Sequence, residues 1–154
     1  MAELTRKEVI QIIATAGRQV KLSGVDLSGL DLTQVNLYGA DLLGANLSDC
    51  TLKRARLSKA ELGWARLKRA NLELAYLHEA SLIGSDLRGA DLQKSVLLKA
   101  NLMGANLEGA DLRGALLTDA DLAGANLALV HVDDRTEWPA GFELNRHEQG
   151  RAEL

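Results

Sequence analysis

Three histidines, one cysteine and a few pairs of acids are the side chains that could do chemistry in this 154-residue chain. His78, His131 and His147 lie far apart in the sequence, and Cys50 has no second cysteine to pair with. Histidine, cysteine and carboxylate residues nowhere gather with the spacing of a metal site. We therefore expect no bound metal and no internal disulfide.

Acidic pairs are the remaining candidates for catalysis. Asp91 and Asp111 are twenty residues apart, as are Asp41 and Glu61, and both pairs would be neighbours in the coils predicted below. Two carboxyls in contact can raise the pKa of one of them, as a general acid requires. An exposed convex face offers no cleft for a substrate, so we expect solvated acids, no cofactor and no enzyme. Glycine-rich stretches such as 104–109 lack the strand-to-helix context of a phosphate loop.

Leucine recurs at every fifth position from Leu22 to Leu127 without a miss. In a helix these leucines would step about 140° per repeat around the axis, and in a strand they would alternate faces. A chain that turns a corner once per unit presents every leucine to one common axis instead. The repeat therefore predicts a solenoid. Examples of its expected core are Leu42, Leu62, Leu72, Leu87 and Leu107.

The positions around each leucine support this interpretation. A small residue, usually alanine, lies two positions before the leucine, and on an extended segment it shares the inward face. Cys50 occupies one of these small-residue positions, and we expect it to be plain packing. Two positions after the leucine, glycine is frequent and suits a corner with positive φ. The corner positions from Asp49 to Glu79 hold no glycine, so we expect another turn type there.

Units such as Ala40-Asp41-Leu42-Leu43-Gly44 closely resemble the pentapeptide repeat family, and the resemblance covers about residues 20–134. It implies an all-β solenoid, a right-handed quadrilateral parallel β-helix with four units to a coil and about five and a half coils. Bacterial members of this family carry an aromatic tail after the repeats. Similar residues follow the repeats here.

Both ends of the repeats are predicted to be covered. Thr5 and Glu8 have the spacing of a capping box, and an amphipathic helix from about Arg6 to Ala16 follows, with Gly17 as a stop signal. Within residues 1–19 this helix is expected to cover the first coil, although a partner-binding helix is the alternative. In residues 135–154, Trp138 and Phe142 are expected to plug the last coil. The tail 145–154 is expected to fray.

Charged residues are expected to pair between coils. If residues twenty apart stack about 4.8 Å from each other, opposite charges meet repeatedly along the faces. The expected pairs are Lys53 with Glu73, Asp49 with Arg69, Arg66 with Asp86, Arg88 with Glu108 and Arg113 with Asp133, and the ladder Lys59, Glu79, Lys99 and Asp119 alternates in sign. These pairs explain most of a basic segment, residues 53–69, that could otherwise suggest a phosphate or acidic partner.

One outward column is apolar. Tyr76, Val96 and Leu116 stack in this scheme, with Leu98 beside them, at a position that is otherwise mostly Asp, Asn or another polar residue. The adjoining face carries a weaker stripe of Leu43, Ile83 and Met103, with Trp64 nearby. Contiguous apolar patches mark interfaces more often than scattered apolar residues do. We therefore take Tyr76, Val96, Leu98, Leu116 and Trp64 as the candidate protein-interaction surface.

These observations favour a non-enzymatic scaffold that binds an unidentified protein partner. The alternative is a DNA mimic that binds a type II topoisomerase such as DNA gyrase, as some family members do. A net charge of only −3, and leucine in the central positions where those relatives often use phenylalanine, argue against it. We expect no direct nucleic-acid binding and a monomer or weak homodimer. No secretory signal and no apolar run of about 20 residues is present, so a cytoplasmic protein without membrane contact is expected.

Overall fold

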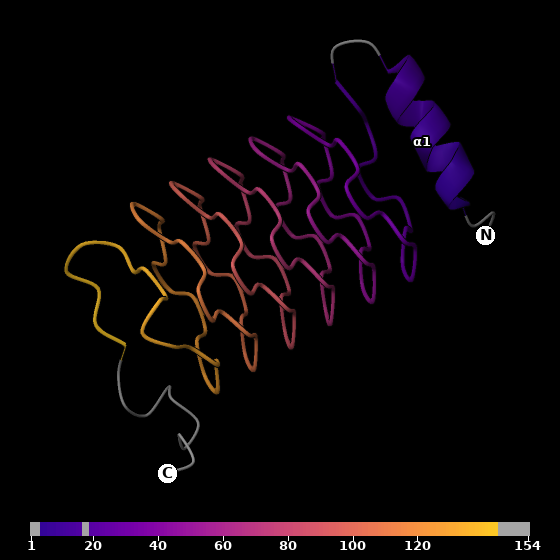
Figure 1. Cartoon of the computed structure of the whole chain (residues 1–154). Helices are drawn as coiled ribbons and strands as arrows, with labels where there is room; N and C mark the ends of the chain where they lie inside the picture. Colours follow the sequence, from indigo (N-terminus) through magenta and orange to yellow (C-terminus); the bar gives the residue numbers. More distant parts are fainter. Residues whose placement is uncertain (1–3, 17–18, 145–154) are drawn as a thin grey trace.

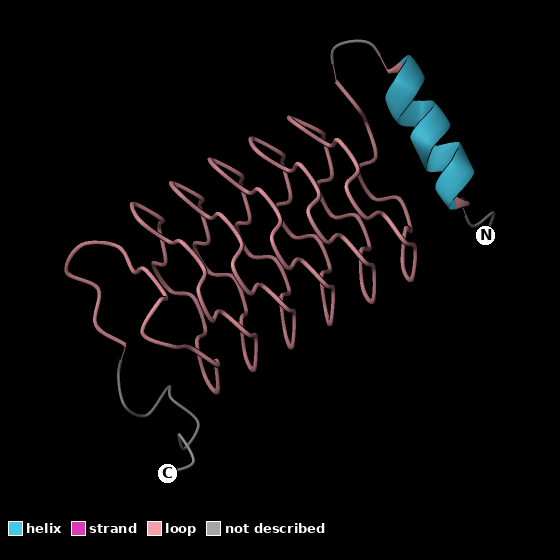
Figure 2. Cartoon of the chain, in the orientation of Figure 1, coloured by secondary structure: helices cyan, strands magenta, loops and turns pink. Residues whose placement is uncertain are grey.

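The computed structural model describes residues 4–16 and 19–144. Figure 1 shows a stack of similar coils, with the single helix of this part of the chain, α1 (Arg6–Thr15), beside the first coil. Gly17 and the tail 145–154, for which the sequence predicted a helix stop and fraying, lie outside the described residues. In Figure 2 the coils carry no arrows, because adjacent coils pair through isolated parallel bridges and not through long strands.

The register of the solenoid is twenty residues, which corresponds to four five-residue units per coil. Parallel bridges join Lys21 to Asp41, Asp41 to Glu61 and so on along all four sides. The last bridge, Leu116 to Glu137, spans twenty-one residues, so the chain carries one extra residue shortly before Glu137. The solenoid predicted from the repeat, with the four sides that the family resemblance implies, is therefore the observed fold.

Backbone hydrogen bonds hold each coil to the next and close each corner. The amide of Leu42 donates to the carbonyl of Glu61 at 2.8 Å, and the amide of Glu61 donates back to the carbonyl of Ala40 at 2.9 Å. Within the corner, the Ala45 amide donates to the Leu42 carbonyl at 3.0 Å. This pattern satisfies the polar backbone next to an apolar interior, where an unpaired group would be costly.

The interior is the predicted column of leucines and small residues. Every leucine of the series is buried, and Leu42, Leu62, Leu72, Leu87 and Leu107 are completely so. Most of the alanines two positions before them are buried as well, as is Cys50. The five-residue period therefore identified the core correctly.

The corners without glycine do not use another turn type, and that prediction is wrong. Arg54, Lys59, Trp64 and Leu74 have φ between 57° and 60°, and the glycine corners Gly44 and Gly84 have φ of 63° and 62°. Stacked coils require the same corner backbone at each level, because from Gly24 to Gly109 the corner amide two residues after the leucine donates to a carbonyl of the next coil. The register overrides the residue's own preference for negative φ.

Helix α1 packs against the N-terminal end of the core. Thr5 and Glu8 form the predicted capping box, with the Thr5 amide donating to Glu8 Oε2 at 2.7 Å. Val9 is completely buried, and Ile12 and Ile13 contact the core from the same helix. At the start of the helix, the Nε of Arg6 donates a hydrogen bond to the carbonyl of Asp31 at 2.7 Å. This bond connects the helix to the first coil.

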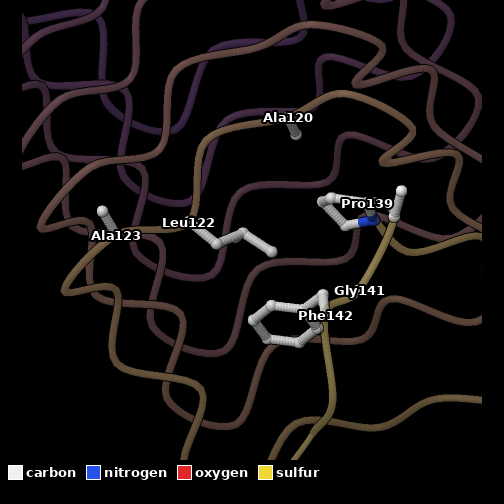
Figure 3. A pocket seen from close by; sticks show the side chains of 7 residues that line it. Ala120, Leu122, Ala123, Pro139, Gly141 and Phe142 are labelled. Carbon is white, nitrogen blue, oxygen red and sulfur yellow. The ribbon is translucent and has the colours of Figure 1, made fainter.

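Aromatic residues lie at the C-terminal end. Trp138 follows the bridge residue Glu137, so it takes the position that leucine takes in earlier units, and its ring stacks on Phe142 with centroids 4.9 Å apart. A shallow pocket of about 300 Å³ lies between this segment and the last coil, lined by Leu122, Ala123, Pro139 and neighbours. Figure 3 shows Phe142 and Leu122 on opposite sides of it. Both Trp138 and Phe142 contact the core.

Candidate functional site

Within the described residues, the histidines and the cysteine that could take part in chemistry lie apart from one another. Among residues 4–16 and 19–144, no group of three or more His, Cys, Asp and Glu side chains is placed to hold a metal ion. His78 Nε2 lies 3.0 Å from Glu79 Oε1 on the surface. His131 is the bridge partner of Asp111, on a different side of the solenoid from His78. His147 lies outside the described residues.

Cys50 is buried in the core, and its Sγ donates to the carbonyl of Leu27 at 2.8 Å. Burial raises the pKa of this thiol to about 11. A thiol rather than a thiolate is present at neutral pH, so Cys50 is a poor nucleophile.

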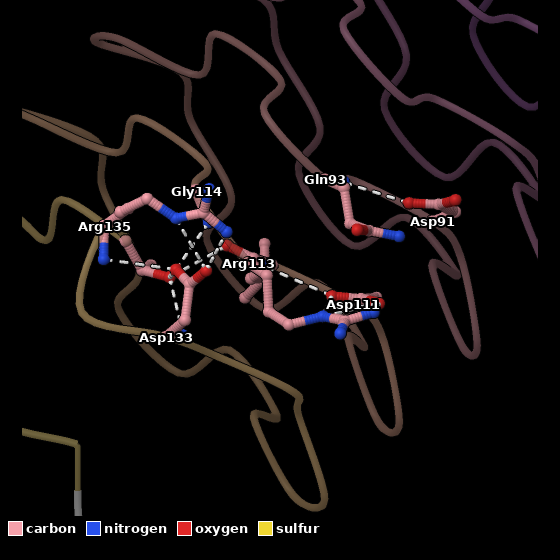
Figure 4. Close-up of polar contacts among 9 residues, drawn as sticks. Asp91, Gln93, Asp111, Arg113, Gly114, Asp133 and Arg135 are labelled. Atoms are coloured by element: carbon pink, nitrogen blue, oxygen red, sulfur yellow. Dashed lines mark hydrogen bonds and ion pairs between the residues drawn. The ribbon is translucent and has the colours of Figure 1, made fainter.

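The carboxyls of Asp91 and Asp111 bind groups of their own extended segments. Asp91 and Asp111 are bridge partners, as the register predicted. Asp91 accepts a hydrogen bond from the Gln93 amide at 3.0 Å, and Asp111 binds the guanidinium of Arg113, as Figure 4 shows. Neither carboxyl lines the pocket between the last coil and Phe142.

The outward position before each leucine has a structural task that the sequence did not reveal. Wherever this position holds Asp or Asn, the side-chain oxygen accepts a hydrogen bond from the backbone amide two residues later, at the corner. For example, Asp31 accepts from Thr33 at 2.9 Å and Asn101 accepts from Met103 at 3.0 Å. The thirteen residues that do so are Asp26, Asp31, Asn36, Asp41, Asn46, Asn71, Asp86, Asp91, Asn101, Asn106, Asp111, Asp121 and Asn126. Short polar side chains therefore fix the corners.

Tyr76, Val96 and Leu116 occupy this same position but cannot accept such a bond. Parallel bridges join Tyr76 to Val96 and Val96 to Leu116, so the three side chains form one vertical column. Tyr76 is 52% exposed, and Val96, Leu116 and the adjoining Leu98 are partly exposed. We call these four residues the Val96 surface. The structure confirms the column of three residues that the sequence predicted, and Leu98 lies beside it as expected.

Trp64 lies on a different face of the solenoid, among the other apolar residues that the sequence singled out. Its side chain is 69% exposed, and its corner column otherwise holds glycine at Gly24, Gly44, Gly84, Gly104 and Gly124. The adjacent column carries Leu43, Ile83 and Met103, and the first and last of these are also well exposed. We call Leu43, Trp64, Ile83 and Met103 the Trp64 surface. The sequence named Trp64 and Tyr76 together as candidate interface residues and expected Trp64 beside the stripe on the adjoining face.

Two large side chains of the Trp64 surface lie close to glycines of the next coil. A Cβ atom added at Gly84 would come within 2.5 Å of Trp64 Cζ3, and one added at Gly63 would come within 3.1 Å of Leu43 Cδ1. The surface contains no charged side chain, so it can be covered by a partner without desolvating an ion.

Ion pairs between coils follow the predicted register in part. Lys53 pairs with Glu73 at 2.5 Å, Asp49 with Arg69 at 2.7 Å and Lys59 with Glu79 at 3.4 Å. These contacts occupy part of the basic segment, as expected.

Other predicted pairs are wrong. Asp86 binds Arg88 at 2.6 Å instead of Arg66, and Arg113 binds Asp111 instead of Asp133, which binds Arg135 at 2.6 Å (Figure 4). Arg88 therefore pairs with Asp86 and not with Glu108. In each case the acid and the arginine are two residues apart on one extended segment, which places them on the same face. The ladder also stops early, since among its described residues only Lys59 and Glu79 lie within ion-pair distance.

Comparisons with known proteins give a consistent family result. A family model described as pentapeptide repeats matches residues 18–54, 55–93 and 100–130 with eight copies. No match to the chain was found among curated proteins. In the described residues, no helix has the length and apolar character needed to cross a membrane.

Several solved structures are similar to the chain. Rfr23, a pentapeptide repeat protein from the cyanobacterium Cyanothece 51142, is 32% identical over 86% of this chain and 98% of its own, with a TM-score of 0.43. HetL, a pentapeptide repeat protein involved in heterocyst differentiation regulation from Nostoc sp. strain PCC 7120, is 32% identical, with 83% of this chain and 60% of its own covered and a TM-score of 0.45. QnrB1, a plasmid-mediated fluoroquinolone resistance protein, is 16% identical over 75% of this chain and 82% of its own, with a TM-score of 0.43.

Proposed function

Because the chain belongs to the pentapeptide repeat family, we propose that it is a non-enzymatic scaffold that binds a partner protein through the Trp64 surface. The right-handed β-helix typical of this family serves as a rigid rod in this proposal, with α1 as the cap of its first coil. The partner is a protein with an apolar, aromatic-accepting pocket, since tryptophan in a fully covered pocket contributes most to protein interfaces.

Trp64 carries this proposal. The residue has φ of 57°, a conformation that costs about 1–2 kcal/mol for a residue with a Cβ, in a column where glycine is otherwise used. Its ring stays 69% exposed, so little apolar area is buried in return. Arg54, Lys59 and Leu74 share this corner conformation, so the φ value does not mark a binding residue. The exposed indole on an uncharged surface is the feature typical of one.

A scaffold role also agrees with the character of the pocket. Its lining consists of Ala120, Leu122, Ala123, Pro139, Ala140, Gly141 and Phe142. None of these side chains can donate a proton, act as a nucleophile or bind a metal. The non-enzymatic part of the proposal is supported by this composition.

The DNA-mimic alternative has weaker support. A mimic needs a continuous anionic face, but Asp49, Glu73 and Asp86 each bind a cation of this chain. A gyrase supercoiling assay separates the two functions, because a mimic inhibits supercoiling or protects the enzyme from a quinolone and a scaffold for another partner does neither.

The scaffold function is tested by affinity capture with matched variants. Trp64→Ala should lose the specific partner that the wild-type protein captures from its native lysate, while Tyr38→Ala, which removes an exposed aromatic residue from another face, should retain it. Both variants should fold, because neither side chain belongs to the buried core. Equal capture by the two variants would exclude the Trp64 surface as the binding site.

A further inference from the structure

One side of the last coil ends without a further rung. On this side the final bridge joins Asn101 to Asp121, and Asp121 has no bridge to a later residue in the described part of the chain. Further along, the amide of Phe142 donates to the carbonyl of Pro139 at 3.0 Å in a turn, so this segment does not add a rung. We call residues 120–124 the open edge.

The open edge presents backbone groups that are paired in the coil before it. The amide of Leu102 donates to the carbonyl of Asp121 at 2.8 Å. The amide of Leu122 occupies the same position one coil later and donates to no described backbone group, and the same is true of the Gly124 amide. The carbonyl of Ala120 accepts from no described amide. Such a row of donors and acceptors is a template for another extended segment.

An apolar pocket lies beside these backbone groups. Ala120 and Leu122 line this pocket of about 300 Å³ together with Phe142, as Figure 3 shows. The end of the core is accessible here, because Leu122 is 8% and Ala120 is 7% exposed, whereas Leu102 and Ala100, one coil earlier, are 0% and 1% exposed. An aliphatic side chain placed over Leu122 would therefore bury apolar surface of the core.

This end of the solenoid is acidic. Arg135 is the only Lys or Arg in residues 119–144, and it binds Asp133 at 2.6 Å. The exposed acids of this segment that have no ion pair among the described residues are Asp119, Asp121, Asp134, Glu137 and Glu143. The field of these carboxylates favours a cationic partner and disfavours a nucleic acid. It also disfavours a second copy placed end to end, which would bring the same acids together.

We propose that the open edge binds an extended, basic peptide segment of a partner protein, which adds one rung to the solenoid. An outward residue of the peptide, level with Asp121, accepts from the Leu122 amide and donates to the Ala120 carbonyl, as Asp121 does with the preceding coil. The next residue is aliphatic and points inward over Leu122, and the residue after it accepts from Gly124. A Lys or Arg at the outward position lies about 4.8 Å from Asp121 along the stack.

The open edge is separate from the Trp64 surface. Gly124 is in the same corner column as Trp64 but three coils further along, which is about 14 Å at the usual spacing of paired strands. The opposite end of the solenoid offers no equivalent site, because helix α1 packs against the core there. The proposal therefore concerns a second binding site and does not depend on the function proposed for Trp64.

Hydrogen exchange measured by NMR tests the open edge in the full-length protein. In the free protein, the amides of Leu122 and Gly124 should exchange much faster than those of Leu102 and Gly104, their equivalents one coil earlier. The probe is a peptide with blocked ends and the sequence Ser-Gly-Ala-Lys-Leu-Lys-Gly-Ser, added up to millimolar concentration. Bound peptide should slow the exchange of Leu122 and Gly124 about tenfold or more and leave Leu102 and Gly104 unchanged.

Changed peptides and matched variants test the charge and pocket contacts. Glutamate in place of both lysines should weaken binding about tenfold or more, and aspartate in place of the leucine should abolish it. Asp121→Asn should weaken binding about two- to fivefold, because asparagine removes the charge but keeps the oxygen that accepts the Ala123 amide. Asp41→Asn, the same change in the same column four coils earlier, should bind the peptide like the wild type.

Several results would overturn the proposal. Slow exchange of Leu122 and Gly124 in the free protein would mean that the tail 145–154 or a second copy already covers the open edge. Failure of the peptide to bind, binding that leaves these two amides unchanged, or equal binding of the glutamate peptide would also contradict it. Trp64→Ala should bind the peptide like the wild type, so failure of the scaffold function and failure of this proposal are distinguishable.

Discussion

The indole ring of Trp64 occupies the space that a Cβ atom at Gly84 of the next coil would need. A methyl group at Gly84 would come within 2.5 Å of the ring atom Cζ3, which is closer than such contacts allow. Gly84 therefore has two roles: it adopts φ of 62° at the corner, and it leaves room for the ring. The residue in one coil determines where the exposed tryptophan of the preceding coil can lie.

Gly84→Ala should displace the Trp64 ring. The left-handed φ alone costs about 1–2 kcal/mol for alanine, and the steric contact with the ring adds to this. Gly104→Ala is the matched control, because its φ is 64° and nothing lies within 4 Å of the added methyl. We expect a larger drop in melting temperature and a change in tryptophan fluorescence for Gly84→Ala only. Equal effects in the two variants would contradict the described position of the ring.

Arg54→Gly should stabilise the protein. Arg54 has φ of 57° at a corner, and among the described residues it takes part in no ion pair, so little is lost with its side chain. Glycine adopts this conformation without the steric penalty of about 1 kcal/mol. Arg54→Ala separates the two effects, since it removes the side chain but keeps the strain. Chemical denaturation should rank Gly above both Ala and wild type, and a glycine variant that is less stable than the alanine variant would argue against strain at this corner.

The features that follow from the five-residue repeat could be predicted from the sequence. The features that depend on hydrogen bonds and ion pairs within one segment could not. The burial of Leu72 and the contact of Lys53 with Glu73 follow from the register alone, so the sequence predicted both. The corner at Trp64 was not predicted, because residue preference indicated another turn and the hydrogen bonds of the stacked coils imposed the same one. The pairing of Asp86 with Arg88 was missed for a related reason. Stacking was considered only between coils, although an extended segment also puts residues two apart on one face.

The candidate surfaces show the same division. The sequence placed Tyr76, Val96 and Leu116 in one column, because this needs only the twenty-residue register. It did not reveal that Asp and Asn at this position accept the corner amide, although their frequency there was a signal. The apolar column stands out because Tyr76, Val96 and Leu116 lack this hydrogen bond, and the bond becomes visible only in the structure.

Ser85→Ala should stabilise the core. Ser85 occupies an inward small-residue position, and its hydroxyl is the one buried side-chain polar atom without a hydrogen-bond partner among the described residues. Removing an unsatisfied buried hydroxyl should raise the free energy of unfolding by about 1 kcal/mol. Ser95 is equally buried, but its Oγ donates to the Leu92 carbonyl at 2.7 Å. Ser95→Ala should therefore be neutral or destabilising, and a gain of the same size in both variants would show that the hydrogen bond is immaterial.

Acid should weaken the protein through its paired aspartates. The guanidinium of Arg69 donates two hydrogen bonds to Asp49, at 2.7 and 2.8 Å, and these hold the pKa of Asp49 below its ordinary value. Hydrogen bonds from Arg88 lower the pKa of Asp86 in the same direction. Because the folded pKa lies below the unfolded value of about 3.9, each contribution to stability is complete above that pH. It is lost as the pH falls through the folded pKa.

Urea denaturation of the wild type and Asp49→Asn, from neutral pH down to strongly acidic pH, tests whether the charge of Asp49 stabilises the protein. The wild type should be more stable than the variant at neutral pH, and the difference should shrink as the pH falls below about 4, because the protonated carboxyl can no longer pair with Arg69 as an anion. The stability of the variant should therefore depend less steeply on pH in this window. A difference that stays constant from neutral to strongly acidic pH would mean that the charge of Asp49 does not contribute to the stacking of these two coils.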